Sequence, residues 1–310
     1  MSDHETQRAH LRRWGGFTVK PKVSIGVCVK NGASTIREAI ESIIHQDFPH
    51  ELMEVIFVDD GSEDETPSII RYYASKMDMK TKVFHHKWKG LGPSRNVVVN
   101  NAHGDYIIWV DADMILPKNH VRKQVEFMER NSKVGIGKAK YGFMRRESMV
   151  AVLENIPWIV FDSRAGSMEV KLPGTGGAVY RVDAIRQVGG FDNCMKGVGE
   201  DQDAAYRVRE VGWAIKRSPA FFYERRVRVW GDLWRKHFWY GYGDYFLYRK
   251  NRNVFSLYRM IPVAGFVVGA LTVVDAYRLT HLKSVFMLPF HYAFKLTSWC
   301  FGFVRAQVSS

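Results

Sequence analysis

The stretch GDYIIWVDAD, residues 104–113, constrains the fold of this chain more than any other segment. Residues 106–110 form an apolar run of β-branched and aromatic side chains, which is typical of a strand buried on both faces of a sheet. The run is followed by Asp111-Ala112-Asp113. Alternate side chains of an extended backbone lie on the same side. The sequence therefore predicts that both carboxylates leave the end of the strand in one direction.

Two neighbouring carboxylates repel each other unless a cation lies between them. A hard divalent ion that keeps open positions for phosphate oxygens suits such a pair, so Asp111 and Asp113 are candidate metal ligands. A second interpretation needs no ligand, because Asp is common in turns, where its side chain bonds to nearby backbone. The segment alone leaves both interpretations open.

Strands and helices are expected to alternate from residue 22 to residue 110. Short apolar runs bounded by polar turns predict the strands, and amphipathic stretches between them predict the helices. Such alternation with short links is typical of an α/β fold with a doubly wound, mostly parallel sheet. The expected strands are 22–29, 52–58, 82–86 and 106–110, and the expected helices are 36–46, 66–76 and a short one after a glycine-containing loop at 90–96.

Polar residues follow three of these strands at the point where each strand ends. They are Val29-Lys30-Asn31, Asp59-Asp60 and Asp111-Ala112-Asp113. The ligand crevice of a doubly wound sheet lies beyond the carboxyl ends of its strands, so we expect three separate segments to deliver polar groups to one edge. The sequence contains no P-loop motif, and no G-x-G-x-x-G motif follows the first strand. Both common nucleotide-binding folds are therefore disfavoured.

Composition narrows the class of partner. The chain of 310 residues suits one large α/β domain plus an appendage, and its net charge of +13 favours nucleic acid, anionic lipid or phosphorylated substrates. Cys28, Cys194 and Cys300 are far apart and in no metal-binding spacing, which predicts reduced thiols in a cytosolic setting. The N-terminal residues are polar and charged, so we expect no signal peptide.

Three features of the second half add to the candidate site. Residues 173–177, PGTGG, predict a flexible loop before a strand at 178–180, and residues 188–192 predict a turn. Residues 199–203, GEDQD, precede a predicted amphipathic helix at 204–211. Acidic residues there also have a purely structural interpretation, because they cap a helix and interact favourably with its dipole.

Together these segments resemble family 2 glycosyltransferases, which have the GT-A fold. The matching stretches occur in the family's order between residues 23 and 213, and their combination is far more specific than any one of them. They are VSIGVCVKN at 23–31, VDDGSEDET at 58–66, GLGPSRN at 90–96, GDYIIWVDAD at 104–113, TGGAVYR at 175–181, VGGFD at 188–192 and GEDQDAAYRVREVGW at 199–213.

The resemblance implies a site for a nucleotide-sugar donor. Asp59, with Asp60 beside it, would recognise the base and the ribose, and Val29 with its neighbours would contact the base through backbone groups. Arg95 would lie near the nucleotide, and Asp111 would face the ribose. The residues implied in donor binding are Val29, Asn31, Asp59, Asp60, Gly90, Arg95, Asp111, Ala112, Asp113, Gly176 and Gly177.

The resemblance also implies a mechanism. Asp201, with Glu200 beside it, would be the general base for an acceptor hydroxyl, and in-line attack would invert the anomeric centre. A divalent metal ion, Mn²⁺ or Mg²⁺, bound by Asp113 and Asp111 would neutralise the leaving diphosphate. The loop at Gly176-Gly177 would shape the donor–acceptor site. An acceptor phosphate would already be ionised, and Asp201 would then serve more for positioning.

Two positions depart from the family's pattern. Cys28 stands where the first strand usually ends in proline, which we interpret as a packing variation. Glu224 stands where the family often has a metal-ligating histidine, and a glutamate can ligate a hard cation equally well. It can equally pair with Arg225 or Arg226 at the surface. His237 is a competing candidate for the third metal ligand.

The C-terminal part of the chain has a different character. Residues 225–252 interleave Arg and Lys with Trp and Tyr, a pattern that suits either single-stranded nucleic acid or a membrane surface. The apolar segments 261–274 and 284–304 favour the membrane. The first is short for a hydrocarbon core of ~30 Å, so interfacial or re-entrant helices are expected rather than two clean spans. The alternative is an apolar helix pair packed on the catalytic domain or at a dimer interface.

These expectations combine into one hypothesis: a metal-dependent inverting glycosyltransferase, peripheral or re-entrant at the cytoplasmic face of a membrane. It would move a sugar, preferably UDP-linked, to a lipid-linked or glycan acceptor, with no nucleic-acid partner. A catalytically degenerate scaffold is one alternative. A nucleotidyltransferase is another, which the lack of a glycine- and lysine-rich pyrophosphate loop disfavours. The expected parts are a tail (1–20), a nucleotide-sugar-binding half (21–116), an acceptor-binding half (117–222), basic aromatic interfacial helices (223–253) and apolar membrane-associated helices (254–310).

Overall fold

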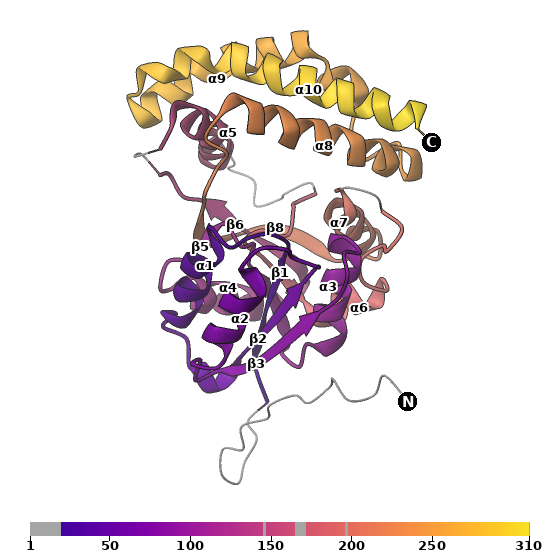
Figure 1. The fold of residues 1–310 in the computed structure, drawn as a ribbon. Coiled ribbons are helices and arrows are strands. Elements are labelled where there is room, and N and C mark those ends of the chain that lie inside the picture. The colour runs from indigo at the N-terminus through magenta and orange to yellow at the C-terminus, as the bar shows by residue number, and fades with distance from the viewer. Residues whose placement is uncertain (1–19, 145–146, 165–171, 196–197, 310) are drawn as a thin grey trace.

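A computed structural model describes residues 20–144, 147–164, 172–195 and 198–309 of the chain. Within these residues, eight strands form one sheet in the order β3-β2-β1-β4-β7-β6-β8-β5, with helices packed around it (Figure 1). The strands are β1 (Val23–Val29), β2 (Met53–Asp59), β3 (Lys80–His85), β4 (Tyr106–Trp109), β5 (Met114–Ile115), β6 (Val134–Tyr141), β7 (Ala178–Arg181) and β8 (Ala214–Glu224).

The first half of the sheet is parallel, as the strand–helix alternation predicts. Strand β1 pairs in parallel with β2 on one side and with β4 on the other, and β2 pairs in parallel with β3. The register sets Val29 opposite Asp59, so the polar residues that follow β1 and β2 meet at one edge. Strands β1, β2 and β4 are almost wholly buried, which explains their nearly continuous apolar sequences.

The second half of the sheet is mixed. Strand β7 lies antiparallel between β4 and β6, β6 and β8 are parallel, and β5 pairs antiparallel with the end of β8. The sequence did not predict β6 and β8 as long strands. Their apolar residues do not alternate regularly, and two register shifts interrupt their pairing. Most of this half belongs to residues 117–222, which the sequence analysis expects to bind the acceptor.

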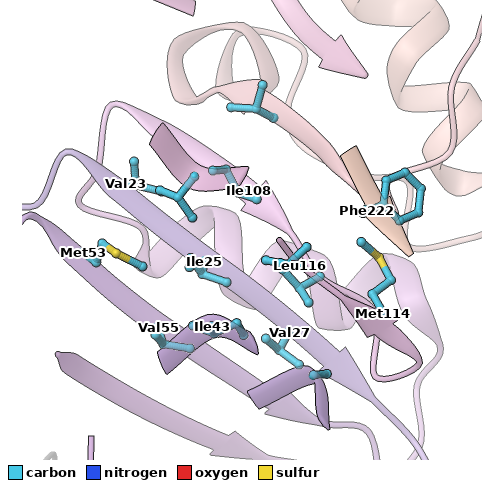
Figure 2. Packing of buried hydrophobic residues seen from close by; sticks show 14 of the residues in the cluster. Val23, Ile25, Val27, Ile43, Met53, Val55, Ile108, Met114, Leu116 and Phe222 are labelled. Atoms are coloured by element: carbon cyan, nitrogen blue, oxygen red, sulfur yellow. The ribbon is translucent and has the colours of Figure 1, made fainter. Parts of the chain in front are cut away.

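The core lies between the sheet and its helices and continues across both halves (Figure 2). Val27 of β1 and Met53 of β2 belong to the same buried cluster as Met114 of β5 and Phe222 of β8. This shared packing holds the end of β8 beside the segment that follows β4. Glu224 is thereby brought close to the Asp111–Asp113 segment.

Two helices begin earlier than the sequence predicts. Helix α3 starts at Leu91 rather than near residue 96, and α7 starts at Glu200 rather than at Ala204. Gly90 (φ 96°) and Gly199 (φ 104°) immediately precede these helices, and their positive φ lets the chain turn sharply into the first helical turn. The acidic residues 200–203 therefore lie inside α7 and not before it. The helices of the sheet domain are α1 (Ile36–Ile44), α2 (Thr66–Ala74), α3 (Leu91–Asn101), α4 (His120–Arg130), α6 (Val182–Gln187), α7 (Glu200–Glu210) and the 3₁₀ turn η1 (His50–Leu52).

The C-terminal residues form a helical layer above the sheet domain. Helices α9 and α10 lie side by side across α8, and α5 lies beneath them (Figure 1). The basic aromatic segment 225–252 is mostly one long helix, and the two apolar segments fall in α9 and α10. The helices of this layer are α5 (Met149–Arg164), α8 (Trp230–Lys250), α9 (Pro262–Thr280) and α10 (Leu288–Val308), with the 3₁₀ turns η2 (Leu257–Met260) and η3 (Lys283–Met287).

Buried polar groups tie the helices of this layer to one another. The carboxylate of Glu154 in α5 forms an ion pair with Lys295 of α10, whose Nζ lies 2.6 Å away. His291 Nε2 lies 3.3 Å from the same carboxylate. On α8, Asp244 accepts a hydrogen bond of 2.7 Å from the indole N–H of Trp299 in α10. Helix α5 also contacts β6, and Lys250 Nζ of α8 lies 2.7 Å from the carboxylate of Asp203 in α7. The helical extension expected from the sequence is therefore a packed layer in contact with the sheet domain.

Candidate active site

Polar segments from β1 and β2 converge at the carboxyl edge of the sheet. The amide of Asp60 donates to the carbonyl of Val29 (2.8 Å), and the amide of Asn31 donates to Ser62 Oγ (2.8 Å). The amide of Glu63 in turn donates to Asn31 Oδ1 (2.9 Å). Asn31 adopts a left-handed conformation (φ 52°) that aims its side chain at the 62–63 loop. The convergence predicted from the strand ends is confirmed.

Asp59 and Asp60 are buried and bind other parts of the chain. His85 Nδ1 lies 2.5 Å from Asp59 Oδ2. Asp60 accepts hydrogen bonds from the amides of Lys89 (2.8 Å) and Gly90 (2.9 Å), one on each carboxylate oxygen. Asp60 therefore shapes the loop that leads into α3. The direct contact of Asp59 and Asp60 with a nucleotide stays a prediction, as do the backbone contacts expected of Val29 and Gly90.

Asp111 and Asp113 follow β4 and face Glu224 across the β5–β8 pair. Met114 is the register partner of Glu224, and the amide of Arg225 donates to the carbonyl of Asp113 (2.8 Å). Burial, and then the charges of Glu224 and Asp111, raise the pKa of Asp113 to about 7. Three carboxylates thus share a small region, with Ala112 between the first two.

The pKa of Asp111 is also raised. Burial acts first, Arg95 opposes it, and Glu224 adds to it. The side chain of Asp111 also keeps 45% of its surface exposed, so an ion can reach it. A carboxylate that is accessible and crowded by like charges gains from a bound cation.

This donor set fits a divalent metal ion held by Asp113 and Asp111. Repulsion among the carboxylates would be relieved by a cation, and oxygen ligands are what Mg²⁺ and Mn²⁺ prefer. Across the described ranges, no three His, Cys, Asp or Glu side chains form a complete site. An ion there would take further ligands from phosphate oxygens, as such ions commonly do.

Glu224 is engaged by a neighbouring arginine. Its Oε1 lies 2.5 Å from Arg226 Nη1 and 3.8 Å from Lys236 Nζ, whereas Arg225 pairs with Glu38 (2.6 Å). The structure therefore has Glu224 paired with an arginine, as the alternative interpretation expected. The role of Glu224 as a metal ligand stays a prediction. The rival candidate His237 lies 3.6 Å from Glu154 in the helical layer.

Arg95 links the two sides of the site. It lies in the second turn of α3 and is 5% exposed. Its Nη1 contacts Glu200 Oε1 of α7, and its Nη2 lies 4.0 Å from Asp111 Oδ1. Burial opposes the charge of Arg95, but Glu200, Asp201 and Asp111 together raise its pKa, so it stays a cation. Glu200 is thereby committed to Arg95 and supports the site as its partner.

Asp201 lies in the first turn of α7, beside the loop that the PGTGG motif forms. The amide of Thr175 donates to Asp201 Oδ2 (3.2 Å), and the amide of Gln202 donates to Oδ1 (2.8 Å). A Cβ atom at Gly176 would lie 2.6 Å from Asp111 Oδ2, so a larger residue there would force the Asp111 carboxylate to move. Residues 174–177 thus lie against both Asp111 and Asp201 and bridge the two halves of the site.

The acidic cluster 200–203 therefore has two functions. Asp203 is structural, because it pairs with Arg207 (2.9 Å) on its own helix and with Lys250 (2.7 Å) of α8. Glu200 and Asp201 face the site. The structural interpretation holds for Asp203, and the roles of Glu200 and Asp201 in the reaction stay predictions.

Sequence reasoning named Arg95 but gave Lys138, Arg226 and Lys236 no place in the site. Lys138 of β6 is buried and donates to the carbonyls of Gly174 (3.1 Å) and Gly176. Arg226 is 8% exposed and, with Lys236, lowers the pKa of Asp113 against the effect of the acids. Their sequence signal was a lysine within a strand and arginines in a basic run, and both patterns are common on protein surfaces.

A family comparison identifies the chain. The family model for glycosyl transferase family 2 matches residues 24–189, which contain the first two carboxylate segments and the 174–177 loop. The chain belongs to glycosyltransferase family 2. The family assignment made from the sequence is thus confirmed.

Individual relatives agree with this assignment. The chain is 26% identical over 259 residues to the "probable glycosyltransferase YdaM" of Bacillus subtilis, which covers 77% of this chain and 61% of YdaM. It is 33% identical over 110 residues to the poly(ribitol-phosphate) beta-N-acetylglucosaminyltransferase TarS of Staphylococcus aureus, 36% of this chain and 19% of TarS. The chain therefore spans less than two thirds of the length of these relatives.

Solved structures confirm the GT-A fold. The mannosyltransferase PcManGT of Pyrobaculum calidifontis, in complex with GDP-Man and Mn²⁺, superposes with a TM-score of 0.67 at 18% identity, over 96% of this chain and 91% of PcManGT. A piece of S. aureus TarS in complex with UDP-GlcNAc gives a TM-score of 0.52 at 18% identity, over 93% of this chain and 92% of that piece. Both alignments extend through the helical layer, so the likeness in fold covers nearly the whole chain.

Proposed function

We propose that this glycosyltransferase catalyses metal-dependent, inverting transfer from a nucleoside diphosphate sugar to a lipid-linked or glycan acceptor at a membrane surface. The observation that supports the proposal best is the bridge formed by residues 174–177. This loop lies against Asp111 on the donor side and against Asp201 on the acceptor side. A carboxylate pair for the leaving diphosphate and a base for the incoming hydroxyl thus lie on opposite sides of one loop.

The geometry suits a single in-line displacement. The bond between the anomeric carbon and the diphosphate oxygen breaks as the acceptor oxygen forms its bond on the opposite face, and Asp201 accepts the acceptor's proton. A bound divalent ion would neutralise negative charge on the leaving diphosphate. Arg95 supplies a fixed positive charge 4.0 Å from Asp111. The Thr175 amide holds the base through Oδ2.

A UDP-linked donor is the favoured choice. TarS was solved with UDP-GlcNAc, whereas PcManGT was solved with GDP-Man and Mn²⁺, so the fold accommodates both nucleotides. In the proposal, Asp59 and the backbone near Val29 contact the base, and Asp111 faces the ribose. Asp111 and Asp113 would hold Mn²⁺ or Mg²⁺.

A thermal-shift panel tests the donor and the metal together. The protein is heated with UDP-, GDP- and dTDP-sugars, each with and without Mn²⁺. A ligand present at ~100 times its dissociation constant adds ~2.7 kcal/mol of stability, which moves the melting temperature measurably. Metal-dependent stabilisation by one nucleotide supports the proposal and names the donor class. No shift with any donor would refute it and favour a degenerate scaffold.

The outer surface of the helical layer supports the membrane part of the proposal. Apolar side chains of α9 and α10 are widely exposed there, for example Val263 (71%), Leu271 (70%) and Phe301 (59%). Helix α9 is long and apolar enough to cross a membrane by length and composition, a criterion that core helices of soluble proteins also meet. Because α9 packs along α10, we propose that the layer lies in the interface, with basic residues drawn to anionic lipid.

Charge substitutions on this surface test membrane binding. The double variant Val263→Glu with Leu271→Glu should weaken binding to vesicles of phosphatidylcholine and phosphatidylserine by about 10-fold or more, since each apolar side chain contributes roughly 1.5–3 kcal/mol when buried. Tyr72→Glu on α2, which is 52% exposed in the wild type, is the matched control and should leave flotation unchanged. Equal binding by all three proteins would show that another surface carries membrane contact.

A further inference from the structure

Lys138 is a buried cation that the proposed mechanism leaves unused. It lies in the middle of β6 and is 6% exposed. Its ammonium donates to the carbonyls of Gly174 (3.1 Å) and Gly176, the residues immediately before and after Thr175. Both acceptors are main-chain atoms of the loop that bridges Asp111 and Asp201.

The position is costly for a lysine. Burial lowers the pKa of Lys138 to about 8, and the charges of Glu224, Asp111 and Asp201 only partly offset this effect. The rings of Tyr141 and Phe222 lie 5.3 and 5.2 Å from the ammonium and stabilise a cation there. An apolar residue would pack among these rings without that cost, so the ammonium has a specific use at this place.

That use is visible in the loop. The Thr175 amide, which lies between the two carbonyls held by Lys138, donates to Asp201 Oδ2 (3.2 Å). Gly176 lies against Asp111 Oδ2. The amide of Gly177 donates to the carbonyl of Trp109 at the end of β4 (3.1 Å). Lys138 therefore fixes a segment of which one residue orients the proposed base and the next lies against Asp111.

We propose that Lys138 is a positioning residue that sets the distance between the donor carboxylates and the base by holding residues 174–177. The inference rests on the proposed function, because it assigns roles to Asp111 and Asp201. Lys138 itself touches neither reacting group. Its loss would let the loop move, and a misplacement of about 1 Å can lower turnover about 100-fold.

Three variants test the proposal in steady-state transfer assays with the donor found in the thermal-shift panel. Lys138→Met should lower kcat about 100-fold and leave KM for the donor nearly unchanged, since donor binding does not need the base. Lys138→Arg keeps a cation that can donate to both carbonyls and should recover at least part of the loss. Lys82→Met is the matched control.

Lys82 suits that purpose because it is also a partly buried strand lysine that donates to a main-chain carbonyl. Its Nζ lies 2.8 Å from the carbonyl of Asn101 and 3.3 Å from Glu54, outside the residues of the proposed site. Lys82→Met should lower the melting temperature without changing kcat at a temperature where it is folded. A fall in kcat of the same size in both Met variants would overturn the positioning role, as would unchanged kcat in Lys138→Met.

Hydrogen–deuterium exchange adds a readout that needs no activity. Lys138→Met should speed exchange of the peptide that spans 172–178, whereas Lys82→Met should not. If Lys138→Met is unfolded at the assay temperature, Lys138→Gln is used in its place. Its shorter, neutral side chain should likewise lower kcat and speed exchange of the 172–178 peptide. Unaltered exchange in the loop would overturn the proposal even if kcat falls. Absence of transfer by the wild type would refute the proposed function, while faster exchange in the variant would still support the hold of Lys138 on the loop.

Discussion

Asp244 offers the clearest quantitative test of how the helical layer joins the catalytic domain. Its carboxylate lies on α8, accepts a hydrogen bond from Trp299 of α10 and is close enough to Asp201 to feel its charge. Burial is the largest influence and raises the pKa of Asp244 to about 7, from an ordinary value of 3.8. The folded protein therefore keeps a proton on Asp244 that the unfolded chain has already lost.

The direction of the pH dependence follows from this difference. Between about pH 4 and pH 7 the native state binds the additional proton, so the free energy of unfolding falls as the pH rises, by at most about 1.4 kcal/mol per pH unit. The difference of about three pH units corresponds to about 4 kcal/mol, and partial exposure of the side chain reduces it to about 2–4 kcal/mol. This stability is present below pH 4 and is lost above pH 7.

The substitution Asp244→Asn removes the titration and keeps an oxygen that accepts from Trp299. We expect the variant to match the wild type near pH 3–4 and to exceed it at pH 8 by about 2–4 kcal/mol, or by about 3–6 °C in melting temperature. Differential scanning calorimetry from pH 4 to pH 8 measures both curves. Other acids with raised pKa values, such as Asp113, occur in both proteins and cancel in the comparison.

A control on the same helix separates burial from charge. Asp232, whose side chain is 45% exposed, pairs with Arg235 at the surface. Asp232→Asn should leave the dependence of melting temperature on pH unchanged. Parallel curves for Asp244→Asn and the wild type would refute the reasoning. So would a variant that is less stable than the wild type at pH 8, because Asp244 would then be ionised and stabilised in the native state.

Three further substitutions probe the site and its support. Asp201→Asn should lower kcat by about 10²–10⁴ while calorimetry still detects donor binding, and an active variant would remove the assigned base. Gly177→Ala should destabilise the fold and lower kcat, because φ is 68° and a Cβ atom would meet the ring of Phe222; unchanged urea denaturation would contradict this. Glu154→Gln should cost about 3–5 kcal/mol in urea denaturation, since it leaves Lys295 buried without its partner, and a loss below about 1 kcal/mol would show that water replaces the carboxylate.

The parallel half of the fold was predictable because its signals are local. A buried strand such as β4 is a short apolar run bounded by polar residues, and the polar residues after β1, β2 and β4 mark one edge regardless of how the rest folds. Helix starts were less predictable. Leu91-Gly92-Pro93 looks like a loop by composition, but Pro93 is tolerated in the first turn of α3, where its missing N–H has no partner to lose.

Apart from Arg95, which the resemblance supplied, the basic residues of the site were not predictable, because their partners are distant in sequence. Lys138 bonds to carbonyls 36 and 38 residues further along, and the contact of Arg95 with Glu200, across 105 residues, was not predictable either. Nothing near Lys138 in VGIGKAKY distinguishes a buried ammonium from a solvated one. The resemblance to the family supplied the acidic residues and their order. Which basic residues lie beside them, here Lys138 and Arg226, depends on tertiary packing.

Helix α8 joins the active site to the helical layer. One of its turns carries Lys236, which lies 3.8 Å from Glu224 and lowers the pKa of Asp113. About two turns later it carries Asp244, whose pKa is raised in part by the charge of Asp201. Its other side packs against α10. In the proposed membrane-bound form, a lipid-linked acceptor would lie in the membrane that α9 and α10 face. Its reacting group would then approach the base from the side of the helical layer, which places the acceptor on the side of Asp201 and leaves the donor side to the parallel strands.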